Sequence, residues 1–417
     1  MLRSRTVLAT ALTLVVAASL AGCADTGLPM PTPTPSPTYP VTGDGVLRIG
    51  TLFATTAPYG ASQVAGVEAA VREINEAGGI NGVPVEVFHR NSGDTTTETA
   101  ETAYAELVAK GVDVVIGPTS SALAERLVTP VIAAGVPLIS PSATSPSLTT
   151  LDDGGLVFRT ISSYADQGAV IAAELADAGA AKVAYLYLDD ANGAALLDSL
   201  TAATEEEGLA LAYSGSFTTT TSSFSSIISK IKKAKPDAVV LATPAEAVEQ
   251  TTALITALTT ASLGGDKLWL TSQNLANYST TLPAAELEGA HGVSEAAVPD
   301  EAFVARLKQA DPGLGTTRYA AEAYDATILA ALAAVRAGDD GGPAIARLLP
   351  TVSAKGIVCT SFGQCLDVLS TEPDIDYDGV SGPVNLTAAG DVTSASWTLY
   401  AYSADNVSTP VRTVISG

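Results

Sequence analysis

The chain alternates between short apolar runs and longer segments with apolar residues at helical spacing. In segment 64–77, Val64, Val67, Val71 and Ile74 recur every three or four positions before a Gly-Gly pair ends the pattern. The strands expected from such patterns are 46–53, 83–88, 112–116, 136–140, 182–188, 209–214, 238–242 and 267–270. The expected helices are 64–77, 97–110, 123–134, 165–178, 194–207, 224–234 and 245–258. This rhythm predicts an α/β protein with parallel sheets, in which ligands bind beyond the carboxyl ends of the strands.

The N-terminus has the features of an export signal. Arg3 and Arg5 precede the apolar run 7–20, which is shorter than the roughly 20 residues that span a bilayer. The run ends in LAGC at 20–23, which resembles the lipobox of bacterial lipoproteins. We therefore expect residues 1–22 to be removed and Cys23 to carry diacylglycerol, which would anchor the protein on the extracytoplasmic face of the cell membrane. The alternative is an ordinary cleaved signal with an incidental cysteine.

A proline-rich tether follows this signal. Residues 26–42 have no apolar periodicity, so residues 23–45 are expected to form an extended spacer. About 370 residues remain, which favours two lobes over a single core.

Charge and cysteine content limit the partners. Lys and Arg number 21 and Asp and Glu 44; without residues 1–22, which hold two Arg and no acid, the net charge is 19 − 44 = −25. Such a surface repels nucleic acid.

Beyond Cys23 the cysteines are Cys359 and Cys365, an even pair in an exported chain, so a disulfide is expected, with two free thiols as the alternative. These cysteines lack metal-ligand spacing with His89 and His291, so a metal site is not expected. The chain also has no Walker motif and no Gly-rich dinucleotide fingerprint, so no other cofactor is expected.

Several short motifs, in one order along the chain, resemble the type I periplasmic binding proteins, most of all the leucine/isoleucine/valine-binding branch. They are IGTL at 49–52, AGGING at 77–82, IGPTSS at 116–121, ISPSATSP at 139–146, FRT at 158–160, YDA at 324–326 and GVSGPVNL at 379–386. The resemblance implies two Rossmann-like lobes joined by three crossover segments, near 159–162, 293–297 and 382–385. Lobe one would then be 46–160 plus 295–382, and lobe two 161–294 plus 383–417.

The same resemblance implies a function. Members bind a small polar solute, often an amino acid, by hinge closure of the lobes and deliver it to the permease subunits of an ABC importer. A monomer and these partners are therefore expected for this chain. A sensing subunit of a membrane signalling system and a structural envelope lipoprotein are the rival interpretations.

Three strand-end loops of lobe one carry candidate ligand-binding residues. Ser120 and Ser121 lie where a helix start could hold a carboxylate, although simple N-capping would also explain these serines. The loop Ser142, Ala143 and Thr144 offers carbonyl and hydroxyl groups, with an ordinary Pro/Ser turn as the alternative. By resemblance, Ser121 would hold the ligand carboxylate and Tyr59 would line the cleft; a surface turn aromatic is the alternative for Tyr59.

Lobe two departs from the family pattern. Asn192 stands where relatives place a tyrosine, and Gln273 where amino-acid binders place a glutamate against the ligand ammonium. An amide supplies no compensating charge, so Asp189, Asp190 or Glu246 would have to provide it, or the ligand is an amide, a carboxylic acid or another small polar solute.

An enzyme, such as a secreted hydrolase, is disfavoured. The chain has no Gly-x-Ser-x-Gly elbow, and its two histidines follow a strand and precede a crossing, which suggests structural roles. The pairs Asp189-Asp190 and Asp339-Asp340 are expected to lie in solvated turns.

Overall fold

The computed structural model describes residues 41–57 and 59–416. The predicted signal peptide, Cys23 and most of the predicted tether lie outside these residues. No helix in the described ranges is long and apolar enough to cross a membrane.

The first lobe is built on a five-stranded parallel sheet of order β2-β1-β3-β4-β5. Its strands are β1 (Arg48–Phe53), β2 (Glu86–Asn91), β3 (Val114–Ile116), β4 (Leu138–Ser140) and β5 (Val157–Arg159). Successive side chains of β1 alternate between two cores, with Ile49 and Phe53 in one and Leu52 in the other. This alternation explains why helices cover both faces of the sheet.

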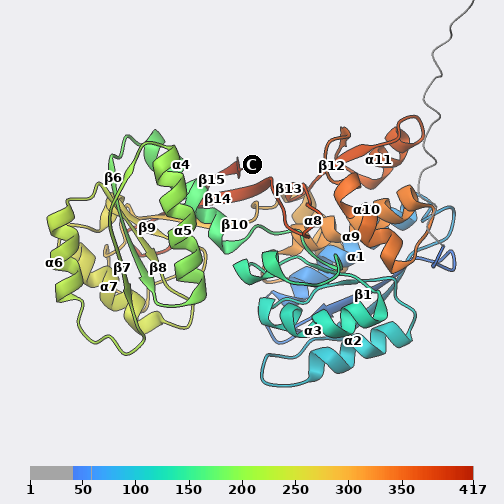
Figure 1. The fold of residues 1–417 in the computed structure, drawn as a ribbon, viewed down its shortest axis with the longest axis horizontal. Coiled ribbons are helices and arrows are strands. Elements are labelled where there is room, and N and C mark those ends of the chain that lie inside the picture. Colours follow the sequence, from blue (N-terminus) through green and yellow to red (C-terminus); the bar gives the residue numbers. More distant parts are fainter. Residues whose placement is uncertain (1–40, 58, 417) are drawn as a thin grey trace, which may run out of the picture. The chain divides into compact units, whose positions relative to one another are not determined.

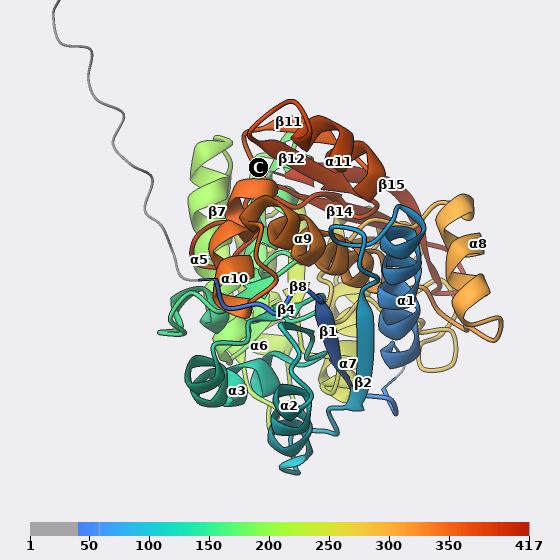
Figure 2. The same cartoon turned by 90° about the vertical axis from the view of Figure 1, so that its right-hand side faces the viewer.

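One face of this sheet packs on α1 (Gly60–Glu76) and α9 (Ala320–Ala337), and the other on α2 (Thr99–Ala109) and α3 (Ser121–Ala134). Figure 2 shows α9 and α2 on opposite sides of β1. Helices α1 and α9 approach closely, since a Cβ added at Gly66 would lie 2.2 Å from the carbonyl oxygen of Ala320. The same core takes in α8 (Glu301–Ala310), α10 (Gly342–Val352) and α11 (Phe362–Leu369).

The second lobe is built on a seven-stranded sheet of order β15-β14-β10-β9-β8-β6-β7. Its strands are β6 (Lys182–Leu188), β7 (Ala210–Phe217), β8 (Ala238–Ala242), β9 (Leu268–Leu270), β10 (His291–Glu295), β14 (Ala395–Tyr402) and β15 (Ser408–Ser416). Helices α4 (Gln167–Asp177) and α5 (Ala191–Glu206) cover one face, and α6 (Ser225–Ala234) and α7 (Val248–Thr260) the other. Figure 1 shows both lobes.

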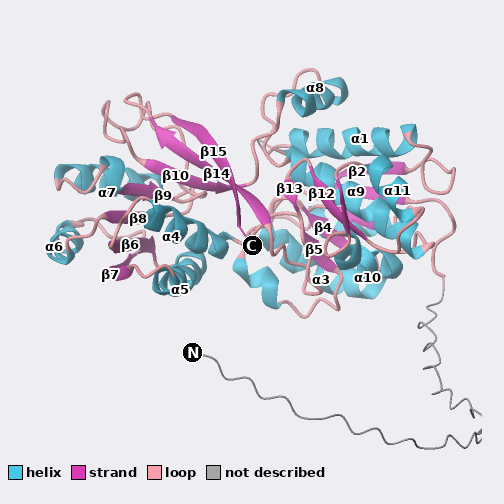
Figure 3. Ribbon diagram, turned by 90° about the horizontal axis from the view of Figure 1, so that it is seen from above, coloured by secondary structure: helices cyan, strands magenta, loops and turns pink. Residues whose placement is uncertain are grey.

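The C-terminal part of the chain holds elements that the sequence patterns did not assign. Strands β14 and β15 join the second sheet antiparallel beside β10, so this sheet is mixed rather than purely parallel (Figure 3). A small sheet of β11 (Ile357–Cys359), β12 (Ile375–Gly379) and β13 (Gly382–Pro383) belongs to the first lobe. The disulfide Cys359–Cys365 joins β11 to α11.

The third connection between the lobes runs through the C-terminal strands. Val384, Leu386 and Val392 pack in the first-lobe core, although the sequence prediction assigned residues from 383 onward to lobe two. Strand β14 then begins at Ala395 in the second sheet. Ala395 also packs in the first-lobe core, so the chain leaves this core only at the start of β14.

The two acidic pairs expected in solvated turns differ in their surroundings. Asp339 and Asp340 are 8% and 7% exposed, because they accept hydrogen bonds from the backbone of residues 42–45. The prediction of a solvated turn was therefore wrong for this pair. Asp189 is exposed, as expected, whereas Asp190 is half-buried and caps α5 by accepting a hydrogen bond from the Gly193 N–H at 2.7 Å.

Candidate ligand-binding site

Three strand-end segments of the first lobe meet in one hydrogen-bond network. Gln63 lies on the helix after β1, Thr119 follows β3, and Ser142 follows β4. The Gln63 amide donates to Ser142 Oγ at 2.6 Å, and Thr119 Oγ1 donates to Gln63 Oε1 at 2.8 Å. Ser142 Oγ in turn donates to the Thr119 carbonyl at 3.0 Å. The hydroxyl protons of Ser142 and Thr119 are therefore used inside the protein.

The two serines at the start of α3 differ in their side-chain contacts. Ser120 is the N-cap residue of α3 but makes no side-chain capping bond. Ser121 Oγ accepts from the Ser145 N–H at 3.1 Å, so it helps to fix the loop after β4.

The other predicted residues of the loop after β4 also have protein partners. Ala143 is fully buried and packs with Ala124 and Leu148. The Thr144 carbonyl accepts from the Tyr164 N–H at 2.7 Å, which ties this loop to the start of the second lobe. A ligand-contacting role for these loop residues stays a prediction.

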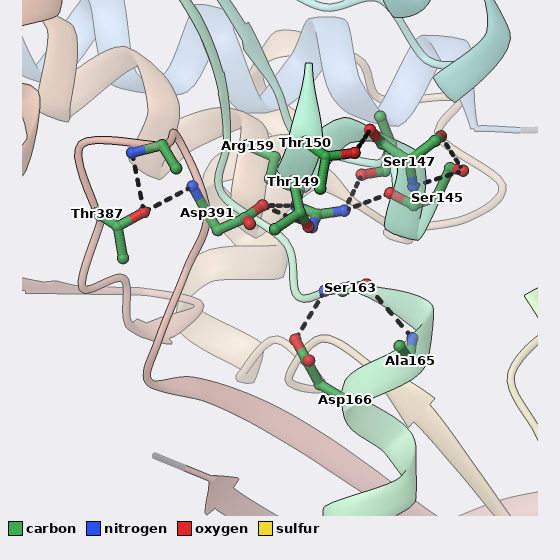
Figure 4. A network of polar contacts seen from close by, with 12 residues as sticks. Ser145, Ser147, Thr149, Thr150, Arg159, Ser163, Ala165, Asp166, Thr387 and Asp391 are labelled. Carbon is green, nitrogen blue, oxygen red and sulfur yellow. Dashed lines mark hydrogen bonds and ion pairs between the residues drawn. The ribbon is translucent and has the colours of Figure 1, made fainter. Parts of the chain in front are cut away.

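Arg159 connects the loop after β4 with the third connection. It is 2% exposed, and its guanidinium donates to Asp391 Oδ1 at 2.7 Å, to Thr149 Oγ1 at 3.0 Å and to the Ser145 carbonyl at 2.9 Å. A capping box at Ser163 and Asp166 begins the next segment. Figure 4 shows Arg159 between Thr149 and Asp391, with Ser163 and Asp166 nearby. The ion pair fixes the first crossing to the chain just before β14.

Tyr59 lies in an aromatic group that also holds a cation. Its ring meets the Tyr319 ring edge-on, with centroids 5.2 Å apart. The Arg318 guanidinium carbon lies 5.4 Å from the Tyr59 centroid and 4.8 Å from the Tyr319 centroid. Ser62 Oγ donates to the Arg318 carbonyl at 2.6 Å, which holds this segment against α1.

A buried carboxyl marks the second crossing. Glu295, the last residue of β10, accepts from Gln167 Nε2 at 3.0 Å and from Ser272 Oγ at 2.8 Å, both on Oε1. Burial raises the pKa of this carboxyl above its usual range. Glu295, Arg318, Tyr319 and Tyr400 line a common cavity of about 340 Å³.

The two predicted residues of lobe two are half-buried. Asn192 lies in the first turn of α5, and Gln273 follows β9 next to Ser272. The hydrogen bonds of the second crossing involve Ser272 and Gln167 rather than Gln273. A ligand-contacting role for Asn192 and Gln273 remains a prediction.

The two histidines have structural contacts. His89 Nδ1 lies 2.8 Å from Thr51 Oγ1, and its Nε2 lies 2.6 Å from a Glu68 carboxylate oxygen. His291 stacks on Trp269 with ring centroids 4.6 Å apart.

The chain is similar to known proteins along most of its length. The family described as periplasmic binding protein matches residues 46–405. The chain belongs to this family. Its relatives place it in the branch that resembles leucine/isoleucine/valine-binding proteins, as the sequence motifs predicted.

Two relatives illustrate the range of this branch. One is the chemotactic signal transduction system substrate-binding protein BasB of Halobacterium salinarum, 29% identical over 337 residues that cover 78% of each chain. Another is the leucine-, isoleucine-, valine-, threonine- and alanine-binding protein of Pseudomonas aeruginosa, 30% identical over 223 residues. That match covers 53% of this chain and 56% of the Pseudomonas protein, so it spans little more than half of either.

Solved structures show the same fold. The isoleucine complex of LivJ from Streptococcus pneumoniae has a TM-score of 0.60 at 22% identity, covering 89% of this chain and 99% of LivJ. A solute-binding protein from Rhodopseudomonas palustris in complex with p-hydroxybenzoic acid has a TM-score of 0.63 at 18% identity, covering 89% and 97%. The two-lobed type I fold predicted from the sequence is therefore confirmed.

In this periplasmic binding protein, sequence reasoning missed the charged residues at the second crossing. Arg318 precedes the buried helix α9, which the patterns did not assign, and Glu295 was treated only as a lobe boundary. The sequence did hold one usable signal, which is that both residues are isolated charges in uncharged segments. Glu295 is the single acid or base besides His291 in 289–299, and Arg318 is the single charged residue in 312–321. Their common cavity depends on residues far apart in sequence, which the sequence alone does not bring together.

Proposed function

We propose that this chain is the solute-binding component of an ABC-type importer, held on the extracytoplasmic face of the membrane by lipid on Cys23. It captures a small polar solute, an amino acid or a related amide or carboxylate, by closing one lobe over the other. Membership of the family supports the binding role, and the named relatives and solved neighbours bind amino acids or an aromatic acid. These relatives are binding proteins, which supports a non-enzymatic role.

The observation that carries this proposal is the convergence of the strand-end segments in the first lobe. Gln63, Thr119 and Ser142 follow three different parallel strands and share one hydrogen-bond network. Parallel α/β folds bind ligands at this edge of the sheet. A network that fixes three loops there provides a preorganised surface on which a solute docks first.

The segments that join the two lobes are where closure would take place. Arg159 and Asp391 join the first crossing to the third connection, and Gln167 joins the start of α4 to Glu295 at the second. Bending at these segments would bring lobe two over a docked ligand, and the closed state would be selected because both lobes then contact it.

A sensing role is the second candidate. It is favoured by the similarity to the chemotactic substrate-binding protein of Halobacterium salinarum, which extends over 78% of each chain. Affinity purification from the native membrane separates the two: permease and ATPase subunits support import, whereas a transducer or kinase supports sensing.

A thermal-shift screen of the purified protein tests the binding role. The panel holds amino acids, amides, organic acids and small sugars. A ligand at a hundred times its dissociation constant adds about 2.7 kcal/mol, which raises the midpoint by about 3 °C for a chain of this size. No shift across the panel would contradict the proposed function.

A further inference from the structure

Arg318 is a guanidinium held in place without an ion pair. It lies against the rings of Tyr59 and Tyr319, and none of the ion pairs among the described residues includes it. The other arginine near the crossings, Arg159, is neutralised by Asp391. A half-buried guanidinium that has no direct ion pair is a strong partner for a planar carboxylate.

The nearest acidic groups form no ion pair with Arg318, although Glu295 is near enough for its charge to raise the pKa of Arg318. Glu295 is 4% exposed, and its Oε1 is engaged by Gln167 and Ser272. Glu322, on the first turn of α9, is 2% exposed, and its Oε1 has no hydrogen-bond partner. Burial raises the pKa of Glu322 to about 8, so this carboxyl is mostly neutral at pH 7.

Arg318 and Glu295 nevertheless line one cavity. It measures about 340 Å³ and also has Tyr319, Tyr400 and Leu275 in its wall. Glu295 ends β10 at the second crossing, whereas Arg318 comes just before α9, and none of the ion pairs among the described residues joins the two side chains. A cavity with separate positive and negative groups is suited to a ligand that carries both charges.

Two hydroxyls at the strand ends of the first lobe, those of Ser142 and Thr119, already have partners inside the protein. Ser142 Oγ already donates to the Thr119 carbonyl, and Thr119 Oγ1 to Gln63 Oε1. Recognition of a carboxylate by these two hydroxyls would require breaking internal bonds, whereas Arg318 would gain a partner without losing an ion pair.

We propose that Arg318 binds the carboxylate of the solute and that Glu295 binds its ammonium group. The cavity beside the second crossing would then select a small zwitterion. Glu295 provides the negative charge that Gln273 lacks. This inference rests on the proposed function, because it names the solute class of the same binding protein.

Isothermal titration calorimetry on the purified protein tests this assignment. Each L-amino acid is titrated first, and then the α-amide and the deaminated acid of the tightest binder, together with 4-hydroxybenzoate. We compare the parent protein with R318Q, R318K, E295Q and the control R336Q, which removes an exposed arginine of the nearby helix α9. Circular dichroism confirms that each variant is folded.

We expect an amino acid to bind best, with its amide and its deaminated acid each at least about 30-fold weaker. R318Q should lose affinity for the amino acid by a similar factor but scarcely change affinity for the amide, and R318K should restore part of the loss. E295Q should remove the preference for the amino acid over its deaminated acid, and R336Q should match the parent protein.

Two results would overturn the inference while leaving the proposed function intact. One is an amino acid that binds R318Q and E295Q as tightly as R336Q; the other is tight binding of an acid without an amino group that E295Q does not alter. No binding by any member of the panel would overturn the proposed function itself.

Discussion

Gln167 and Glu295 lie 128 positions apart in the sequence, yet Gln167 Nε2 is 3.0 Å from Glu295 Oε1. The same nitrogen lies 3.1 Å from Ser272 Oγ and 3.1 Å from the Tyr164 carbonyl, and Gln167 Oε1 accepts from the Ser272 N–H at 2.9 Å. Gln167 is fully buried. One side-chain amide thus links the segment after the first crossing to the end of the strand at the second.

Replacing Gln167 with alanine should destabilise the protein by about 1–3 kcal/mol, because buried partners such as the Ser272 N–H are left unsatisfied. Urea unfolding measures this change. The control is Q250A, which removes an amide with one hydrogen bond, to the Thr219 carbonyl near the surface, and should cost less than about 1 kcal/mol. Equal losses for the two variants would show that Gln167 does not link the crossings.

Glu322 should make stability fall as pH rises. Its pKa is raised by burial to about 8 in the folded protein, against an ordinary value of 4.5, so the folded state binds the proton more tightly. The stabilisation is complete below about pH 4.5 and is lost as pH rises towards 8. E322Q should therefore show a flatter dependence of the unfolding midpoint between pH 5 and about 8 than the parent protein.

Asp113 and Asp325 also have pKa values raised by burial, to about 7 and about 6, so only the difference between E322Q and the parent isolates Glu322. Glu372 is exposed, and E372Q serves as the control with an unchanged slope. Parallel curves for E322Q and the parent would contradict the prediction.

Asp339 and Asp340 should fix the backbone at Gly43 and Gly45, where the predicted tether joins the first lobe. Asp339 accepts from the Gly43 N–H at 2.8 Å, and Asp340 from the Gly45 N–H at 3.0 Å. The double variant D339N/D340N weakens these charge-assisted bonds, so limited proteolysis should cut residues 41–46 several-fold faster than in the parent. D152N, which alters an exposed aspartate, should leave the cleavage rate unchanged. Unaltered cleavage in the double variant would mean that other contacts hold this segment.

The sequence predicted the second-lobe strands best. Strand β6 spans Lys182–Leu188, as expected, because a buried parallel strand is a continuous apolar run. Helix α9 was not assigned, since its residues from Ala320 to Ala334 are buried on all sides and show no polar face. The burial of Asp339 and Asp340 depends on backbone N–H groups almost 300 positions away, which no local pattern reveals.

The candidate site was predictable only in its local parts. Loops that follow short buried strands could be found by pattern, and Ser142 and Thr119 do meet through Gln63. What the pattern could not show is that the Ser142 hydroxyl donates to the Thr119 carbonyl and the Thr119 hydroxyl donates to Gln63 on α1. It also could not show that Arg318 has aromatic neighbours but no ion pair, because that depends on where α1 packs.

Cys23 lies outside the described residues, and its lipidation is tested directly. The variant C23A should lose metabolic labelling by palmitate and move from the membrane to the soluble fraction, because two acyl chains are needed for stable anchoring. The neighbouring variant T26A should be labelled and fractionated like the parent. C23A that remains in the membrane fraction and still carries label would contradict a lipid at this position.

The Cys359–Cys365 disulfide should stabilise the region where β11 meets α11. Both cysteines are fully buried, and they are six positions apart, so the closed loop is short. Loop-closure entropy for this length predicts a loss of about 2 kcal/mol in the free energy of unfolding when the bond is removed.

Urea unfolding should show that loss for the parent protein on adding reductant, and for the variant C359A/C365A without reductant. Reductant should not destabilise the variant further, because no bond remains to be cut. A parent protein that is insensitive to reductant and has two alkylatable thiols after unfolding would show that the pair is free in the mature protein.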